Sequence, residues 1–531
     1  MDMSFNDKIL RFFTDVLCPT PRASHCEDVI ADRLEEFAAA RGLTRFRDSK
    51  NNVIIHKPGT GKYAGTSVPV ILQAHTDMIC VPATADFTGG VEAYYSSENR
   101  LTGRSAVTGE KTSLGADDGI GVAAVMAVLD GGEIVHPPLV AIFTAEEECG
   151  LTGAQDVSVD DIMGIAPGLD FGRAAFINLD NGHFGQFSVG CAGSANVTVK
   201  VPVERMGLPP PQNFFSFELA VRGLSGGHSG LSIHEKRGNA NILLCLAVYK
   251  LHYASVDMHI LGFGRCGDAS NAIPSAASVY AAVPAEQENR LREAADEIEF
   301  IFKHIYREFD GWVRLEIRES GEARALTEAA IERMLKIPRE KWPPYCFHRG
   351  DFDDGTPYSV GTVFKLTKLA EEIPNGPIAY SAAMPNLVET SSNLGIIRDE
   401  GRHIAMVYMV RSSIDAERER IVEEIARKAE SYNSTIEAGS RSPGWAYRDK
   451  SALRDLFLNR YKELFGEEAA ASPVHAGLEC GHFAEKFGDF KDMDFISCGP
   501  TTVEIHSVNE TLHTETVEKF GRLLIEVLGS L

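Results

Sequence analysis

Three apolar runs near the start of the chain predict β-strands that are buried on both faces. They are residues 68–77 (VPVILQAHTD), 138–147 (PLVAIFTAEE) and 174–180 (AAFINLD). Helical spacing is found over residues 7–17 and 27–41, and a helix of small residues is predicted over 119–132. Continuous apolar strands separated by helices are typical of a sheet that helices cover on both sides. The pattern therefore predicts an α/β domain with a mostly parallel sheet.

The pattern changes after Cys191. Half-exposed antiparallel strands are predicted where apolar and polar residues alternate, over 195–204, 214–223 and 277–285. Helices are predicted over 239–254, 288–309 and 415–432, and SRSPGW (440–445) is interpreted as a return linker. We therefore expect residues 1–194 and 441–531 to form one α/β domain. Residues 195–440 are expected to form an inserted α+β domain of two β-α-β-β-type units in tandem.

Composition narrows the class of protein. The chain has 531 residues and a net charge of −23, which disfavours a nucleic-acid binder because such proteins carry a basic face. Its ten cysteines form no CxxC pair, a pattern that fits reduced thiols. The N-terminus has no signal-peptide pattern, and no apolar segment is long enough to cross a membrane. We expect a soluble cytoplasmic protein with no membrane or nucleic-acid partner.

Metal-ligand residue types gather at the ends of the predicted strands. They are His75 and Asp77, the pair Glu147 and Glu148, and Asp180, to which LGADDGIG adds Asp117 and VEIHS adds His506. Open α/β sheets bind ligands beyond the carboxyl ends of their strands. A buried strand that ends in charged residues therefore predicts a site at this edge.

Two metal ions with a hydrolytic role suit this set. Such a site needs a carboxylate that bridges ions about 3.5–4 Å apart, together with terminal imidazole or carboxylate ligands. Asp117 is the expected bridge. His75 and Asp180 are assigned to one ion, and Glu148 and His506 to the other.

Two acidic residues remain for other roles. Glu147 is adjacent to a ligand and is assigned as the general base that activates water. Asp77, two residues beyond His75 on the same strand, can accept the imidazole N–H. The alternative class is a metal-binding protein without catalysis, which would have no use for Glu147.

The motifs resemble a known family. AHTDM, LGADDGIG and TAEEECGLTGA are similar to those of the di-zinc exopeptidase family that includes carboxypeptidase G, tripeptidase T and aminoacylase. CAGS, GLSGGHSG, NAIP, VETSSNLG, PGW and HAGLECG resemble the aminoacyl-histidine (Xaa-His) dipeptidases of that family. The resemblance runs from about residue 68 to 510 in matching order.

The resemblance implies roles for the first group of residues. Aligning E-E-x-G-x-x-G-A makes Glu147 the base and Glu148 the ligand, with Glu146 an extra acid. The peptide bond after the bridging aspartate, between Asp117 and Asp118, is implied to be cis.

The resemblance also assigns residues of the inserted domain. His228 resembles the histidine that stabilises the oxyanion, and Asn271 and Arg411 resemble substrate-binding residues. Arg411 is the candidate for the terminal carboxylate, since its planar fork binds carboxylates bidentately. The alternatives are that His228 caps a turn and that Arg411 forms a surface ion pair.

Two choices remain open among the later residues. Either His506 or His513 could be the last ligand, and the H-S-x-x-E wording of the family favours His506. His475 and Glu479 either line the pocket or have a structural role.

The function expected from the resemblance is metal-dependent hydrolysis of small peptides, with Xaa-His dipeptides as substrates. Two Zn²⁺ per chain are expected, and Co²⁺ or Mn²⁺ would fit the same ligands. Tripeptides or N-acyl amino acids are the alternative substrates. A homodimer is a further possibility.

Overall fold

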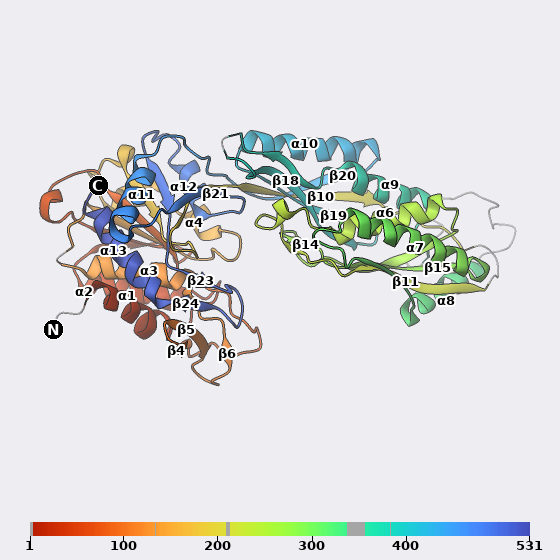
Figure 1. Ribbon diagram of the computed structural model, residues 1–531, viewed down its shortest axis with the longest axis horizontal. Coiled ribbons are helices and arrows are strands. Elements are labelled where there is room, and N and C mark those ends of the chain that lie inside the picture. The colour runs from red at the N-terminus through yellow and green to blue at the C-terminus, as the bar shows by residue number, and fades with distance from the viewer. Residues whose placement is uncertain (1–3, 133, 209–212, 337–355, 383) are drawn as a thin grey trace. The chain divides into compact units, whose positions relative to one another are not determined.

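The computed structural model describes residues 4–132, 134–208, 213–336, 356–382 and 384–531. The chain forms two compact units (Figure 1). The first unit consists of Met1–Cys191 and Pro443–Leu531, and the inserted unit of Ala192–Ser442. Among the described residues, no helix has both the length and the apolar character needed to span a bilayer.

The main sheet of the first unit has eight strands in the order β1-β2-β7-β3-β8-β22-β9-β21. In that order they span Thr44–Arg47, Val53–Lys57, Leu139–Thr144, Val70–His75, Ala175–Asn178, Asp494–Ser497, Gln186–Cys191 and Ala470–Val474. The central strands β7, β3, β8 and β22 are parallel, and so are β9 and β21. Antiparallel pairs join β1 to β2, β2 to β7 and β22 to β9. The predicted α/β sheet is confirmed.

Helices cover both faces of this sheet, which explains why its central strands are apolar throughout. In β3, Leu72 and Ala74 pack into one core and Ile71 into the other. The first core is built with α1 (Phe5–Phe12), α2 (Asp28–Ala40), α3 (Ala116–Asp130), α11 (Ala452–Phe465) and α13 (Thr514–Leu528). The second is built with α4 (Thr152–Asp156), α5 (Val159–Ile165) and α12 (Glu479–Lys486).

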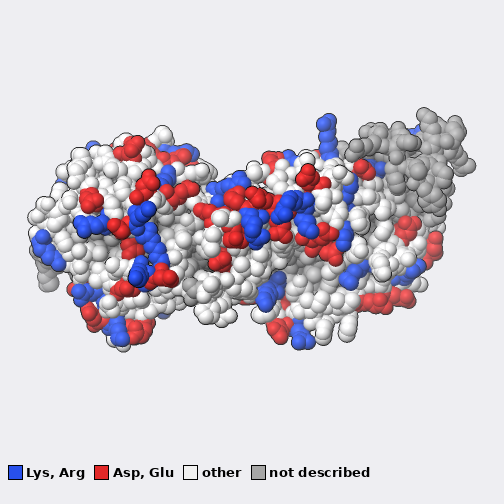
Figure 2. Space-filling view, turned by 90° about the horizontal axis from the view of Figure 1, so that it is seen from above, with Lys and Arg blue, Asp and Glu red and all other residues white. Residues whose placement is uncertain are grey.

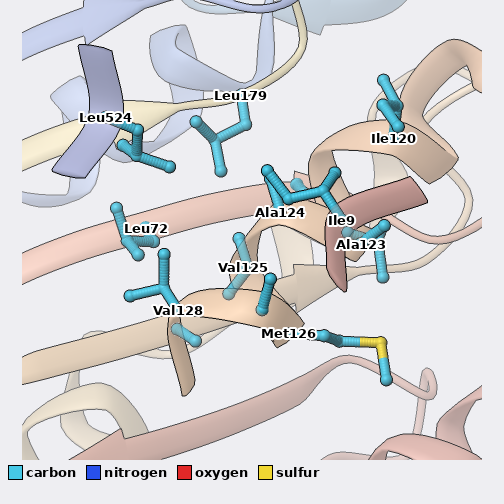
Figure 3. Packing of buried hydrophobic residues seen from close by; sticks show 14 of the residues in the cluster. Ile9, Leu72, Ile120, Ala123, Ala124, Val125, Met126, Val128, Leu179 and Leu524 are labelled. Carbon is cyan, nitrogen blue, oxygen red and sulfur yellow. The ribbon is translucent and has the colours of Figure 1, made fainter. Parts of the chain in front are cut away.

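The helix α3 is buried on nearly all sides. Figure 3 shows its residues Ala124 and Val128 in the same cluster as Leu72 of β3 and Leu524 of α13. A helix in such a place has no polar face, and its small residues allow neighbouring helices to approach closely. This packing fixes the start of α3, where Asp117 lies.

The strands end earlier than the sequence predicted. β3 ends at His75, β7 at Thr144 and β8 at Asn178, so the acidic residues that follow lie in loops. After β7 the chain turns at Glu146, whose φ of 51° lies in the left-handed region. A strand cannot continue through that conformation, and the turn redirects the next two glutamates.

A small second sheet in the first unit was not predicted. Its path is β23-β24-β5-β4, with β6 paired to β5. The strands span Val91–Ser97 (β4), Arg100–Ser105 (β5), Lys111–Thr112 (β6), Thr502–Val503 (β23) and Thr511–His513 (β24). The connection from β23 to β24 carries His506, so this sheet anchors the C-terminal segment beside residues from the first 120.

The inserted unit is an α+β structure with two antiparallel sheets, as expected. One has the order β17-β18-β19-β10-β20 and the other β13-β15-β11-β16, with β12 and β14 as a separate pair. In chain order the strands are β10 (Gly193–Pro202), β11 (Phe214–Arg222), β12 (Gly227–His228), β13 (His259–Cys266), β14 (Ala272–Ile273), β15 (Ala277–Pro284), β16 (Arg314–Glu319), β17 (Gly376–Tyr380), β18 (Val388–Asp399), β19 (His403–Ser412) and β20 (Thr435–Ser442). The helices are α6 (Ala240–Tyr253), α7 (Glu288–Ile305), α8 (Gly321–Leu335), α9 (Val360–Glu372) and α10 (Asp415–Ser431).

The tandem arrangement predicted for this unit is wrong, because one α+β group is nested inside the other. The first sheet takes β10 from the start of the unit and its other strands from residues after α9. The second sheet lies between these parts in the sequence. β10 pairs with β19 and β20, so its partners are more than 200 residues away. Periodicity identifies strands but does not show which distant strands pair.

Charged residues of both signs are mixed on the surface. On the face seen in Figure 2, Lys and Arg residues lie among Asp and Glu residues. In the helix α10, for example, Arg420 lies 2.8 Å from Glu417 and 3.4 Å from Glu424. Pairs at this helical spacing explain why so charged a segment forms a helix.

Candidate metal centre

The candidate site lies at the carboxyl ends of the parallel strands β3, β7 and β8. Acidic residues occupy the loops that follow these strands: Asp77, Glu147 and Glu148, and Asp180. Since neighbouring parallel strands end at the same edge, the three loops meet there. The start of α3 and the connection between β23 and β24 add Asp117 and His506.

The carboxylate of Asp117 lies between two histidines. Its Oδ1 is 3.2 Å from Nε2 of His75, and its Oδ2 is 3.4 Å from Nε2 of His506. Oε1 of Glu148 is 2.8 Å from the same His506 nitrogen. His75, Asp117 and Glu148 each place one ligand-type atom within 4.8 Å of the others. A carboxylate with an imidazole at each oxygen has the arrangement needed to bridge two cations.

These contacts change the acidity of the residues involved. Hydrogen bonds to Asp117 and Glu148 raise the pKa of His506 to about 10. Burial favours neutral His75, but hydrogen bonds to Asp117 and Asp77 raise its pKa well above the ordinary value. Burial opposes ionisation of Asp117, yet the same imidazoles hold its pKa well below its usual range. The neighbouring carboxylates therefore favour the protonated form of both imidazoles.

Asp77 holds the surrounding loops together. It is fully buried, and its Oδ1 is 3.3 Å from Nδ1 of His75. It also accepts hydrogen bonds from the backbone N–H of Glu147 at 3.0 Å, from that of Glu148 at 3.2 Å, and from the Ser24 hydroxyl at 2.7 Å. One carboxylate therefore orients a histidine and fixes the turn that carries both glutamates.

Glu147 and Asp180 are both partly buried near other acidic side chains. Burial raises the pKa of Glu147 well above its ordinary value; the charge of His75 opposes this, while Asp180 and Glu148 add to it. Burial and the charge of Asp117 likewise raise the pKa of Asp180. Carboxylates brought together in this way are stabilised by a cation.

Glu146, the first of the three consecutive glutamates, has a structural role. Its carboxylate accepts a 2.6 Å hydrogen bond from the Thr152 hydroxyl and lies 3.1 Å from His25 and 3.2 Å from Lys50. The hydrogen bonds from Thr152 and His25 lower its pKa to about 2. Its backbone N–H donates to Glu27 at 3.0 Å. These contacts turn it away from the ligand group and hold the turn after β7.

The structure also places the residues whose roles were left open. His513 precedes α13, with Nδ1 3.9 Å from Glu515, so His506 is the histidine beside Asp117. Glu479 is fully buried and accepts hydrogen bonds from Gln73 at 2.5 Å and Thr144 at 2.8 Å. Burial raises the pKa of Glu479 to about 7. His475 is buried in the connection before α12.

The predicted substrate-binding residues Asn271 and Arg411 and the predicted oxyanion histidine His228 lie together within the inserted unit. Arg411 is 5% exposed, and its Nε donates to the Ser229 hydroxyl at 3.5 Å. The N–H of Ser229 donates to the carbonyl of Asn271 at 2.8 Å. Burial lowers the pKa of Arg411 to about 10, and burial with the charge of Arg411 lowers the pKa of His228 to about 4.

His228 caps a turn through one ring nitrogen. Its Nδ1 accepts hydrogen bonds from the backbone N–H of Gly230 at 3.2 Å and of Leu231 at 3.0 Å. The neutral ring therefore carries its proton on Nε2. The alternative interpretation of His228 as a turn cap therefore holds for Nδ1. Among the described residues, no hydrogen bond is found at Nε2.

Two buried residues at this edge were missed from the sequence. Arg22 and Glu510 are each 2% exposed, and both contact the loop that precedes Asp117. The only sequence signal was the glutamate at the end of H-S-x-x-E. In the same loop the Asp117–Asp118 peptide is cis, as the family resemblance implied.

The chain is similar to known dipeptidases over nearly its full length. It is 30% identical over 516 residues to the cytosol non-specific dipeptidase of Escherichia coli (strain K12), covering 96% of this chain and 95% of that protein. The crystal structure of aminoacylhistidine dipeptidase from Vibrio alginolyticus matches with a TM-score of 0.76 and 27% identity, covering 100% of this chain and 98% of that one. Aminopeptidase PepT from Bacillus cereus ATCC 10987 shares the fold, with a TM-score of 0.54, 15% identity, and coverage of 99% and 98%.

A family profile covers most of the chain. The profile described as Peptidase family M20/M25/M40 matches residues 71–529. This range includes the loops after β3, β7 and β8, the start of α3 and His506. The resemblance inferred from the motifs is confirmed. The chain therefore belongs to peptidase family M20/M25/M40 and is a hydrolytic metallopeptidase.

Proposed function

We propose that this protein is a two-metal dipeptidase that hydrolyses Xaa-His dipeptides. The observation that carries the proposal is Asp117, whose two oxygens face His75 and His506 at 3.2 and 3.4 Å. The similar proteins from Escherichia coli and Vibrio alginolyticus are both named as dipeptidases, and the second as an aminoacylhistidine dipeptidase.

The donor set fits two divalent cations. Asp117 would bridge them, with His75 and Asp180 on one ion and Glu148 and His506 on the other. The raised pKa of Asp180, caused by burial and by Asp117, indicates a place where added positive charge is favourable. Imidazole and carboxylate ligands suit Zn²⁺, and also Co²⁺ or Mn²⁺. When bound, such ions polarise a carbonyl group and lower the pKa of water.

Glu147 is proposed as the general base. It would accept a proton from the attacking water and then deliver that proton to the leaving amine. Burial raises its pKa, which brings it closer to that needed for both steps. The hydrogen bond from its backbone N–H to Asp77 fixes the position of the residue.

The inserted unit is proposed to act as a lid that supplies substrate contacts. The Nε2–H of His228 would donate to the oxyanion that develops on the scissile carbonyl. Arg411 would bind the substrate carboxylate, with Asn271 as a further polar contact. No described carboxylate forms an ion pair with the buried Arg411, so its guanidinium is available to a carboxylate ligand.

A peptide panel tests the substrate class. β-Ala-His, Gly-His, Ala-Ala, a tripeptide and N-acetyl-Met are incubated with zinc-loaded protein. We expect the highest kcat/KM for the Xaa-His dipeptides, loss of activity with a chelator, and recovery with zinc. Preference for the tripeptide or N-acetyl-Met would overturn the substrate assignment. If no peptide is cleaved although two metals are bound, the protein is a metal binder without catalysis.

Metal binding is expected to release protons. A ligand imidazole must be neutral, so an ion competes with the proton on His506, whose pKa the adjacent Asp117 and Glu148 raise to about 10. Apparent affinity should therefore keep falling as the pH is lowered from about 10, whereas an ordinary imidazole competes only below about pH 7. Calorimetry near pH 8 in two buffers of different ionisation enthalpy counts the protons. Release of none would contradict the proposed role of His506.

We also propose a cytoplasmic location, supported by the name of the Escherichia coli relative.

A further inference from the structure

The loop before Asp117 is held by a single buried carboxylate. Glu510 accepts four hydrogen bonds from consecutive backbone N–H groups. Its Oε2 accepts from Leu114 at 2.9 Å and Gly115 at 3.0 Å, and its Oε1 accepts from Ala116 at 2.8 Å and Asp117 at 3.2 Å. All four donors of this loop thus converge on one side chain from the far end of the sequence.

Arg22 holds the same loop through a carbonyl oxygen. Its guanidinium donates to the carbonyl of Gly115, and also to those of Thr76 at 3.0 Å and Asp77 at 3.4 Å. It therefore joins the loop before Asp117 to the loop that follows His75. A side chain at Gly115 would place its Cβ 2.5 Å from Arg22 Nη2, and φ there is +72°. The left-handed backbone conformation and this close approach together favour glycine at position 115.

The position of Glu510 connects two ligand-bearing segments. It lies four residues after His506, in the connection between β23 and β24. Asp117 and His506 are 389 residues apart in the chain, and the structure brings their side chains to 3.4 Å. Each hydrogen bond that Glu510 accepts from the loop limits how far Asp117 can shift relative to His506.

We propose that Glu510 is a positioning residue for the metal centre and that Arg22 acts with it. Glu510 binds the backbone N–H groups of residues 114–117, and Arg22 binds the carbonyl of Gly115. Together they keep one oxygen of Asp117 beside His75 and the other beside His506. This inference rests on the proposed function, since it concerns the same ligands. Groups that orient metal ligands commonly change metal affinity or activity about 10–100-fold when substituted.

The substitution Glu510→Gln tests the proposal. Glutamine keeps the size of the side chain, but its amide nitrogen would face backbone donors and remove one acceptor. We expect zinc affinity, measured by competition with a chelating dye, to fall about 10–100-fold. The Co²⁺-loaded variant should also show shifted d–d absorption bands, because the ligands are no longer held in the same geometry.

Asp494→Asn is the matched control for stability. Asp494 is another partly buried carboxylate of the first unit and accepts hydrogen bonds from the Ser451 hydroxyl and from the N–H of Leu453. It begins β22, whereas the strand ends near the site at Ser497. We expect this variant to lose thermal stability while zinc affinity and the Co²⁺ spectrum stay as in the wild type.

The outcomes separate the two proposals. If the wild type binds zinc and Glu510→Gln binds it within about threefold of the wild type, the positioning role is overturned and the proposed function stands. If the wild type itself binds no divalent metal, both fail.

Should Glu510→Gln not fold, Arg22→Lys serves instead, because lysine keeps the charge but cannot reach both loops. Its zinc affinity must then fall several-fold, and unchanged affinity would overturn the proposal.

Discussion

Replacing Glu147 with glutamine is expected to lower kcat about 10²–10⁴-fold, the range for loss of a general acid–base group. Glutamine has nearly the same shape but cannot accept the proton of water. The backbone N–H of residue 147 still donates to Asp77, so the turn should be retained. KM should change little, and metal content measured by elemental analysis should equal that of the wild type. A variant that kept more than about a tenth of wild-type kcat would contradict the role of Glu147.

The neighbouring glutamate provides a matched control. Glu146→Gln changes the same residue type one position earlier, where the carboxylate binds Thr152, His25 and Lys50. We expect kcat to remain within a few-fold of the wild type and thermal stability to fall. If both variants lost turnover equally, a disturbed turn would explain the result better than loss of a base.

The main sheet and the acidic edge could be predicted because they depend on local sequence patterns. A strand buried on both faces must be apolar throughout, and in β3 and β7 this apolar run is visible over six residues. Charged residues directly after such strands indicate a site, because parallel strands end at one edge. His75, Asp77 and Glu148 were found in this way, and the structure brings them into contact with one another or with Asp117.

Apart from the pairing of Asp77 with His75, the contacts that hold the site together could not be predicted. Glu510 and Arg22 bind backbone N–H and carbonyl groups of the loop. Almost every residue type has these groups, so the sequence of the loop does not reveal such contacts. The nested pairing of β10 with β19 and β20 depends on strands that lie far apart in the sequence. The role of Glu146 depends on one left-handed turn. Each of these features is set by tertiary structure, whereas alternation and spacing report only local structure.

Replacing Asp117 with asparagine is expected to abolish zinc-dependent turnover and the stabilisation that zinc provides. The amide has no charge and only one oxygen. It therefore cannot bridge the ion that His75 would bind and the ion that His506 would bind. The imidazoles hold the pKa of Asp117 well below its usual range against the effect of burial, so the wild-type carboxylate is ionised at neutral pH. A ligand present at about 1,000 times its Kd stabilises a protein by about 4 kcal/mol. Unfolding of the wild type with and without zinc should show a gain of this order, and the variant should show little.

Substitutions of His506 and His513 test which of the two histidines is a metal ligand. His506→Gln should reproduce part of the Asp117→Asn effect, because Nε2 of His506 lies 2.8 Å from Glu148 and 3.4 Å from Asp117. His513→Gln should leave zinc binding unchanged, since that side chain faces Glu515. Zinc stoichiometry by elemental analysis distinguishes the two variants. Loss of zinc in His513→Gln with retention in His506→Gln would reverse the assignment and require a different arrangement of the C-terminal segment around Asp117.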